Sequence, residues 1–291
     1  MRVSLAICTM NRPVELGRCL TSVTASRLLP DQILVSDDSN TPELQSATAA
    51  VAGKHSAVRY LEGPRKGLSA NRNNCLRWIT GDLVVFVDDD VVLDPGFLEA
   101  GVRRYMAECD AAGTSRIILT GHEIRPDGAY YPSFLTFLGF YAAGDPGGGR
   151  INATCINSTL FPSGLFREAL FDEAILFGAE ERDISLHALS LGYRLTYAPD
   201  LRNYHYPSPI NRDIYKRSAI VSRIYFGLKR YWLYERSVAH FAAFAVYAPL
   251  NAAGNRLKQG RFSEAWDALR ACRDGWSLFR AHLTSRSSPH A

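Results

Sequence analysis

No apolar run in this chain is long enough to cross a membrane. A spanning helix needs roughly 18 such residues, and the nearest candidate, residues 238–253, contains His240 and Pro249. The chain also lacks a signal-peptide core, because the apolar residues near its N-terminus give way to polar ones at Thr9. These absences predict a cytoplasmic protein.

Metal-binding and disulfide patterns of cysteine are absent as well. None of the six cysteines belongs to a Cys-x-x-Cys pair, and most of them lie in apolar surroundings. We therefore expect buried free thiols in a reducing compartment. The six are Cys8, Cys19, Cys75, Cys109, Cys155 and Cys272.

Neither charge sign is in large excess, since 33 Lys and Arg residues face 29 Asp and Glu residues for a net charge of +4. The hydrophobic content of 47% is typical of a globular protein with a sizeable core. The positive excess lies late in the chain, which suits a membrane surface or an anionic ligand better than nucleic acid. The residues concerned are Arg212, Lys216, Arg217, Arg223, Lys229, Arg230 and Arg236.

The first hundred residues do contain a regular pattern, an alternation of short apolar runs and helical spacing. Short buried strands that alternate with helices predict a parallel sheet covered on both faces. In such a sheet the ligand crevice lies outside the carboxyl ends of the strands. We expect strands at residues 3–8, 32–36, 58–61 and 83–87, and helices at residues 13–23, 43–52 and 69–80.

Three adjacent aspartates, at residues 88–90, end the most apolar of these runs. Carboxylates at the mouth of a buried strand repel one another and resist desolvation. A divalent cation, with the phosphates that it carries, is the usual group that offsets this cost. A solvated acidic turn is the alternative, since Asp-Pro-Gly follows at residues 94–96. Polar clusters also follow the first two strands, at residues 9–12 and 37–40, where a nucleotide site is expected.

The pattern changes in the second hundred residues. Strands are expected at residues 117–124 and 193–198, and the glycine-rich segment 144–149 predicts a mobile lid or a poorly ordered excursion. The last part of the chain is helical, aromatic and basic. We therefore divide the chain into a catalytic domain, residues 1–210, and a helical C-terminal extension, residues 211–291.

Five motifs follow one another in a fixed order. They are Cys8-Thr9-Met10-Asn11-Arg12-Pro13, Val35-Ser36-Asp37-Asp38-Ser39, Gly67-Leu68-Ser69-Ala70-Asn71-Arg72-Asn73, Phe86-Val87-Asp88-Asp89-Asp90, and Glu180-Glu181-Arg182-Asp183 with Gly192-Tyr193-Arg194-Leu195. Each motif alone is weak, but the ordered set resembles glycosyltransferase family 2. The resemblance covers about residues 1–206 and implies the α/β fold called GT-A. This fold has a Rossmann-like, mostly parallel central sheet flanked by helices, followed here by an α-helical C-terminal extension.

The resemblance implies a site for a nucleotide-diphosphate sugar, with a UDP- or dTDP-sugar favoured. The loop after the first strand and Asp38 would hold the nucleobase, an arginine would approach the diphosphate, and two aspartates would contact the ribose or the sugar. A strand-end turn at Asp38 and a helix-surface arginine at Arg72 are the structural alternatives. The residues implied in donor binding are Thr9, Asn11, Arg12, Asp38, Arg72, Asp88 and Asp89.

The resemblance also implies a divalent metal, Mn²⁺ or Mg²⁺. Asp90 matches the family's metal ligand, and His205 lies where many relatives place a histidine, although it could instead be a packed ring between two tyrosines. Glu180 and Glu181 correspond to the acidic pair that supplies the catalytic base of inverting members. Glu181 is the favoured base, the choice between the two stays open, and a charged helix start is the alternative. Asp183 is expected to cap or orient.

Together these residues predict a metal-dependent, inverting hexosyltransferase of cell-surface polysaccharide or glycoconjugate biosynthesis. Natural-product glycosylation and a non-catalytic sugar-nucleotide-binding protein are the alternatives. A nucleotidyltransferase on the same fold is disfavoured, because residues 9–13 lack the glycines of its phosphate loop.

The C-terminal third leaves two interpretations open. Its basic and aromatic residues could lie in a membrane interface. That would place the protein peripherally on the inner face of the plasma membrane, beside a lipid-linked acceptor. Alternatively, its helices could cap the catalytic domain or pair with a second subunit in a homodimer. A glycan or a small-molecule acceptor stays open beside the lipid-linked one.

Overall fold

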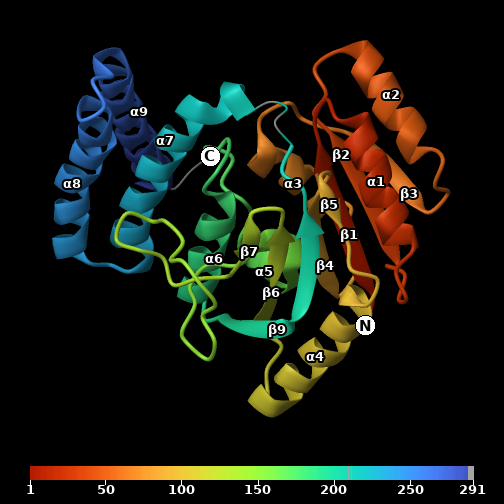
Figure 1. The fold of residues 1–291 in the computed structure, drawn as a ribbon. Helices are drawn as coiled ribbons and strands as arrows, with labels where there is room; N and C mark the ends of the chain where they lie inside the picture. Colours follow the sequence, from red (N-terminus) through yellow and green to blue (C-terminus); the bar gives the residue numbers. More distant parts are fainter. Residues whose placement is uncertain (209, 211, 288–291) are drawn as a thin grey trace.

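A mixed β-sheet organises the larger, N-terminal part of the protein. The computed structural model describes residues 1–208, 210 and 212–287. The strand order is β3-β2-β1-β4-β8-β6-β9-β5, and β7 pairs with β6 beside this path. Figure 1 shows helices around the sheet and the C-terminal helices gathered at one side of the molecule.

The N-terminal half of the sheet is parallel, as the sequence predicts. β1 pairs with both β2 and β4, and β2 pairs with β3, all in parallel register. Every residue of β1 is buried, which explains its unbroken apolar and small-residue sequence. Prolines in the first turn start α1 and α2, where a missing N–H leaves no hydrogen bond unmade. The elements are β1 (Val3–Thr9), α1 (Pro13–Thr24), β2 (Gln32–Asp37), α2 (Pro42–Ala52), β3 (Val58–Glu62), α3 (Leu68–Leu76) and β4 (Leu83–Asp88).

Beyond β4 the sheet mixes directions. β8 runs antiparallel between β4 and β6, and β9 returns parallel to β6. The predicted strands after residue 117 are confirmed, with β9 extending further than expected. The elements are β5 (Val91–Val92), α4 (Phe97–Ala112), β6 (Ile117–Arg125), β7 (Gly128–Tyr130), a 3₁₀ turn (Ile156–Ser158), β8 (Thr159–Pro162), α5 (Leu165–Glu168), α6 (Glu180–Ser190) and β9 (Arg194–His205).

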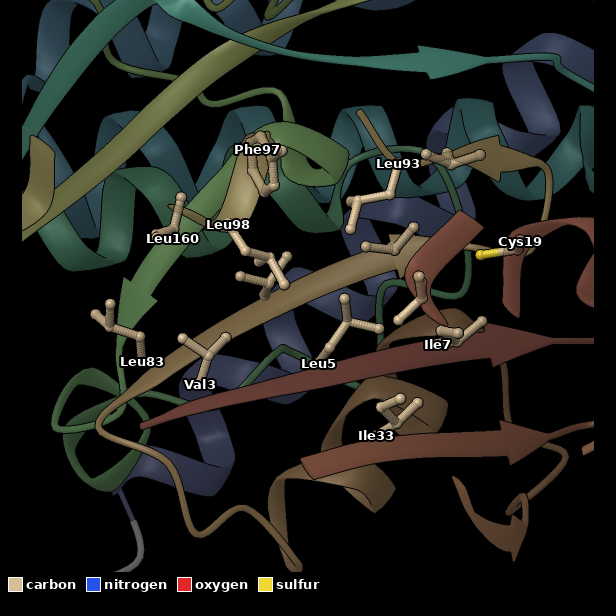
Figure 2. Close-up of a cluster of buried hydrophobic side chains, with 14 of the residues drawn as sticks. Val3, Leu5, Ile7, Cys19, Ile33, Leu83, Leu93, Phe97, Leu98 and Leu160 are labelled. Carbon is tan, nitrogen blue, oxygen red and sulfur yellow. The ribbon is translucent and has the colours of Figure 1, made fainter. Parts of the chain in front are cut away.

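Hydrophobic cores lie on both faces of this sheet. One core joins side chains of β1 to α1 and α4, and Figure 2 shows Leu5 of β1, Cys19 of α1 and Leu98 of α4 within it. The opposite face packs against α3 and α6. All six cysteines are free thiols, and all except Cys109 are buried, which confirms the expectation of unpaired cysteines.

The C-terminal extension is helical and shares a core with the catalytic part. Its elements are α7 (Arg212–Lys229), a π-helical segment (Arg230–Tyr234), α8 (Val238–Leu257) and α9 (Phe262–Ser287). Phe226 and Tyr231 are buried together with Leu135 and Leu186, so the extension packs on α6 and on the loop after β7. No helix within the described residues has both the length and the apolarity needed to cross a membrane.

Two of the late basic residues are buried rather than displayed at the surface. Lys229 is 3% exposed and Arg230 is 4% exposed. The Lys229 Nζ lies 2.5 Å from Asp172 and 2.9 Å from Asp183, so it joins α7 to α6 and to the loop before α6. Asp183, which was expected to cap or orient, forms one of these two ion pairs. The side chain of Arg212, from the same basic set, lies outside the described residues.

We predict that Lys229→Ala lowers the free energy of unfolding by about 3–5 kcal/mol. The substitution leaves two carboxylates in a buried place without their cation. Urea denaturation of wild type, Lys229→Ala and the exposed control Lys258→Ala measures this difference. A loss below about 1 kcal/mol, equal to that of the control, would show that the ion pair does not hold the extension in place.

Candidate functional site

A cavity of about 680 Å³ opens at the carboxyl ends of β1, β2 and β4. This is the place that the strand topology predicts for a ligand. Tyr215 and Ala219 close it from the side of α7, so the C-terminal extension contributes to its wall. The predicted site residues that line it are Thr9, Arg12, Asp38, Asp88, Asp89, Asp90 and His205.

Asp88, Asp90 and His205 form a cluster suited to a divalent cation. One potential ligand atom from each lies within 4.8 Å of the others. The fold brings them together because Val91 of β5, one residue after Asp90, pairs with His205 at the end of β9. The two carboxylates suit Mn²⁺ or Mg²⁺ in ligand type.

The two carboxylate oxygens of Asp90 differ in their hydrogen bonding. Its Oδ2 accepts a hydrogen bond from the Ser208 N–H at 2.9 Å. Its buried Oδ1 lies 3.1 Å from Nε2 of His205 but receives no well-formed hydrogen bond. Burial alone would raise the pKa of Asp90, yet His205, Ser208 and Arg12 together lower it. The carboxyl group is therefore kept ionised, as a metal ligand requires.

Glu123 supports His205 from behind and was not identified from the sequence. Its Oε2 lies 2.7 Å from Nδ1 of His205, and its side chain is buried. Burial opposes a charged imidazole, but Asp90 and Glu123 prevail and raise the pKa of His205 to about 10. A proton on Nε2 and a cation would compete for the same place. The available signal was an acidic residue within the strand predicted at residues 117–124.

Two arginines neutralise the aspartate triplet. The Arg12 Nη1 lies 3.0 Å from Asp89 and 3.2 Å from Asp90. Arg72 is 2% exposed, does not line the cavity, and places Nη2 3.1 Å from Asp88. Burial raises the pKa of Asp89 to about 7, although Arg12 opposes this shift. The carboxylates are therefore compensated partly by the protein itself.

The residues predicted around the nucleobase flank one end of the cavity. Asp38 is buried at 5% exposure, and its Oδ1 accepts a hydrogen bond from the Arg65 N–H at 2.8 Å. Burial raises the pKa of Asp38 to about 6. Thr9 donates a 2.6 Å hydrogen bond to Asp89. Asn11 adopts a left-handed φ of 62° and accepts a hydrogen bond from the Asn40 N–H, so its side chain shapes the loop.

The two adjacent glutamates at the start of α6 occupy different environments. Glu180 accepts a hydrogen bond from the Ala179 N–H at 2.9 Å and lies 3.5 Å from Arg72. Glu181 lies near Glu123 and Tyr141, and burial together with the charges of Glu123 and Glu180 raises its pKa to about 7. Neither glutamate lines the main cavity. Glu181 thus lies outside the wall of this cavity, near Glu123, which contacts His205 in that wall.

The loop that follows β7 is fastened beside Glu181 by the helices around it. Arg182 donates to the Gly139 carbonyl at 2.7 Å, and Tyr231 donates to the Phe137 carbonyl at 2.7 Å. The Tyr141 hydroxyl reaches the Thr154 carbonyl at 2.7 Å. No sequence motif indicated this anchoring. The predicted lid, residues 144–149, lies just beyond it and is largely exposed.

Sequence comparisons find similarity to glycosyltransferases in the N-terminal part of the chain. Residues 4–141 match the family model described as Glycosyl transferase family 2. The chain is 26% identical over 121 residues to a glucosyl-dolichyl phosphate glucuronosyltransferase of Haloferax volcanii, covering 41% of this chain and 39% of that protein. It is 28% identical over 99 residues to the GalNAc(5)-diNAcBac-PP-undecaprenol beta-1,3-glucosyltransferase of Campylobacter jejuni, covering 33% and 32%. The matches thus span 39% and 32% of the lengths of these relatives.

Solved structures share the fold over nearly the whole chain. Mannosyltransferase PcManGT from Pyrobaculum calidifontis, in complex with GDP-Man and Mn²⁺, superposes with a TM-score of 0.59 at 14% identity, covering 99% of this chain and 81% of that one. S. aureus TarS 1-349, in complex with UDP-GlcNAc, gives a TM-score of 0.56 at 15% identity, covering 94% and 92%. At these identities the likeness shows the fold alone, and it confirms the predicted GT-A architecture.

We predict that Glu123→Gln weakens Mn²⁺ binding by about 10- to 100-fold, the usual effect of losing the group that orients a metal-binding histidine. The loss of free Mn²⁺ signal in electron paramagnetic resonance titrations measures the affinity. Glu43→Gln, on the exposed start of α2, is the matched control. Equal affinities for the two variants would contradict a supporting role for Glu123.

Proposed function

Residues 4–141 of this chain belong to glycosyltransferase family 2, and from this premise we propose that the protein is a metal-dependent, inverting glycosyltransferase. It would move a sugar from a nucleotide-diphosphate donor to an acceptor hydroxyl. The observation that carries the proposal is the cluster of Asp88, Asp90 and His205 in the wall of a cavity of about 680 Å³.

The cavity offers separate places for the two ends of the donor. Asp38 lies in its wall and could accept a ring N–H of uracil or thymine, which favours a UDP- or dTDP-sugar. Thr9, at the end of β1 between β2 and β4, lies in the same wall as Arg12 and Asp89, where the ribose and diphosphate would pass. The structurally similar proteins named above were solved with GDP-Man and with UDP-GlcNAc.

Mn²⁺ or Mg²⁺ would be held by Asp88, Asp90 and His205. The available Oδ1 of Asp90 and the support of His205 by Glu123 fit such a group. When bound, the cation stabilises the negative charge that builds on the departing diphosphate. Arg12 would add positive charge on the same side, provided that the diphosphate draws it from the carboxylates that it now neutralises.

Glu181 is proposed as the catalytic base. A pKa of about 7 lets its carboxylate exist at neutral pH and still take a proton from an acceptor hydroxyl. The hydroxyl oxygen would then attack the anomeric carbon from the face opposite the leaving group, which inverts its configuration. Glu180 is committed to Ala179 and Arg72, so it suits a positioning role.

The proposed acceptor is a glycan or a lipid-linked sugar in polysaccharide or glycoconjugate synthesis. The two curated relatives described above carry the names of enzymes acting on dolichyl phosphate and undecaprenol diphosphate carriers. Such an acceptor would place the protein peripherally at the inner face of the membrane. A small-molecule acceptor is the second candidate, because segment 144–149, which follows Tyr141 beside Glu181, is largely exposed.

We predict that Glu181→Gln lowers kcat by roughly 10²–10⁴-fold, the range for loss of a general base. Release of nucleoside diphosphate from the donor in the presence of acceptor measures turnover. Glu180→Gln is the matched comparison and should lose less than about tenfold. Equal losses, or a larger loss in Glu180→Gln, would reverse the assignment.

The pH dependence follows from the same residue. A base must be deprotonated to act, so kcat/KM of the wild type should fall about tenfold per pH unit below a pKa near 7 and level off above it. A profile that stays flat down to pH 5 would exclude Glu181 as the base.

Nuclear magnetic resonance of the product should show the anomeric configuration opposite to that of the donor.

A further inference from the structure

Helix α8 presents an apolar face to solvent along most of its length. Val246 is 65% exposed and Leu250 is 63% exposed. We call these side chains the outer face of α8. It consists of Val238, Ala239, Ala242, Ala243, Val246, Tyr247, Leu250 and Leu257, all exposed and all uncharged.

The outer face cannot be turned inward by rotating the helix. The opposite side of α8 already carries Phe244, Ala248 and Ala252, which are buried against the neighbouring helices. Gly227 of α7 also fixes the contact, because a Cβ there would lie 2.0 Å from the ring of Phe244. A helix that is apolar on all sides is normally covered on all sides. Something outside the described chain is therefore expected to cover α8.

The charges around the outer face of α8 indicate which kind of partner covers it. Residues 235–264 contain four Lys or Arg residues and two glutamates, Glu235 and Glu264, which form ion pairs with Arg230 and Arg261. Arg236 precedes α8 and Lys258 follows it, and both are exposed, so positive charge stands at both ends of the apolar face. Phe262 and Trp266, exposed at the start of α9, add large apolar side chains across the short turn. Apolar residues rimmed by cations complement an anionic lipid surface.

A second copy of this chain fits the same surface less well. In a twofold dimer each face meets itself. Because both ends of α8 are cationic, either a parallel or an antiparallel arrangement would bring Arg236 or Lys258 against a like charge. The glutamates next to the two ends of α8, Glu235 and Glu264, are already paired with Arg230 and Arg261.

We propose that the outer face of α8 docks the protein on an anionic membrane surface. Figure 1 places α8 at the edge of the molecule, away from the sheet, so docking there leaves the sheet unobstructed. This inference rests on the proposed function. A glycosyltransferase with a lipid-linked acceptor would encounter that acceptor at the membrane surface.

Co-sedimentation with vesicles tests the proposal. Wild type should bind vesicles of phosphatidylcholine with about 30% phosphatidylglycerol, and bind pure phosphatidylcholine at least about tenfold more weakly. The double substitution Val246→Glu with Leu250→Glu should weaken binding to the anionic vesicles at least about tenfold. The matched control is Leu29→Glu, which changes an equally exposed leucine in the turn between α1 and β2 and should bind like wild type. Thermal melting of each variant checks that it is folded.

Three results would overturn the proposal. They are no binding of wild type to anionic vesicles, equal weakening in the Leu29→Glu control, and a lipid-free dimer that the double variant converts to monomer in light scattering. The last result would assign the face to a second copy. Nucleotide binding, followed by melting temperature in the same samples, separates failure of the docking surface from failure of the glycosyltransferase assignment.

Discussion

Three carboxylates at the carboxyl end of β4 can be kept together only if positive charge surrounds them, and much of the site follows from that constraint. Arg12 arrives from the loop after β1, Arg72 from the buried side of α3, and His205 from the end of β9. Each comes from a different strand or helix, so the sheet order must be complete before the charges balance. The arrangement leaves Oδ1 of Asp90 without a well-formed hydrogen bond, which is where a cation would find its place.

The same logic extends outward from the site. Glu123 links His205 to the neighbourhood of Glu181, so the metal cluster and the proposed base share one buried acidic neighbour. On the other side of α6, Lys229 holds Asp172 and Asp183 and thereby fastens the C-terminal helices to the catalytic part. The extension is thus built into the site's wall, through Tyr215 and Ala219, and still leaves one face of α8 uncovered.

Local pattern was sufficient for most of the N-terminal fold. Unbroken apolar runs predicted the parallel strands β1 to β4, and the aspartate triplet together with its neighbouring motifs led to the cavity wall. Helix α4 was not predicted, although its pattern could have indicated it. Its buried residues Phe97, Leu98, Gly101 and Tyr105 repeat at helical spacing. Strands as short as β5 and β8 carry too few residues to show a period.

The remaining features depend on residues that are distant in sequence. Glu123 gains its role only from His205, 82 positions later. Lys229 belongs to a basic stretch expected at the surface, and only its two carboxylate partners explain why it is buried. Composition gave the charge of that stretch, but it could not predict which of the basic side chains are buried.

The central claim is that a nucleotide diphosphate binds here through a cation at Asp90. The most direct test is the melting temperature of wild type, Asp90→Ala and the surface control Asp110→Ala with UDP, dTDP, GDP and their sugars, with and without Mn²⁺. A ligand that binds only the folded protein raises the melting temperature by mass action. The account predicts a metal-dependent rise with one nucleotide in wild type and control, and its loss in Asp90→Ala. A folded wild type that no nucleotide stabilises, with or without Mn²⁺, would contradict it.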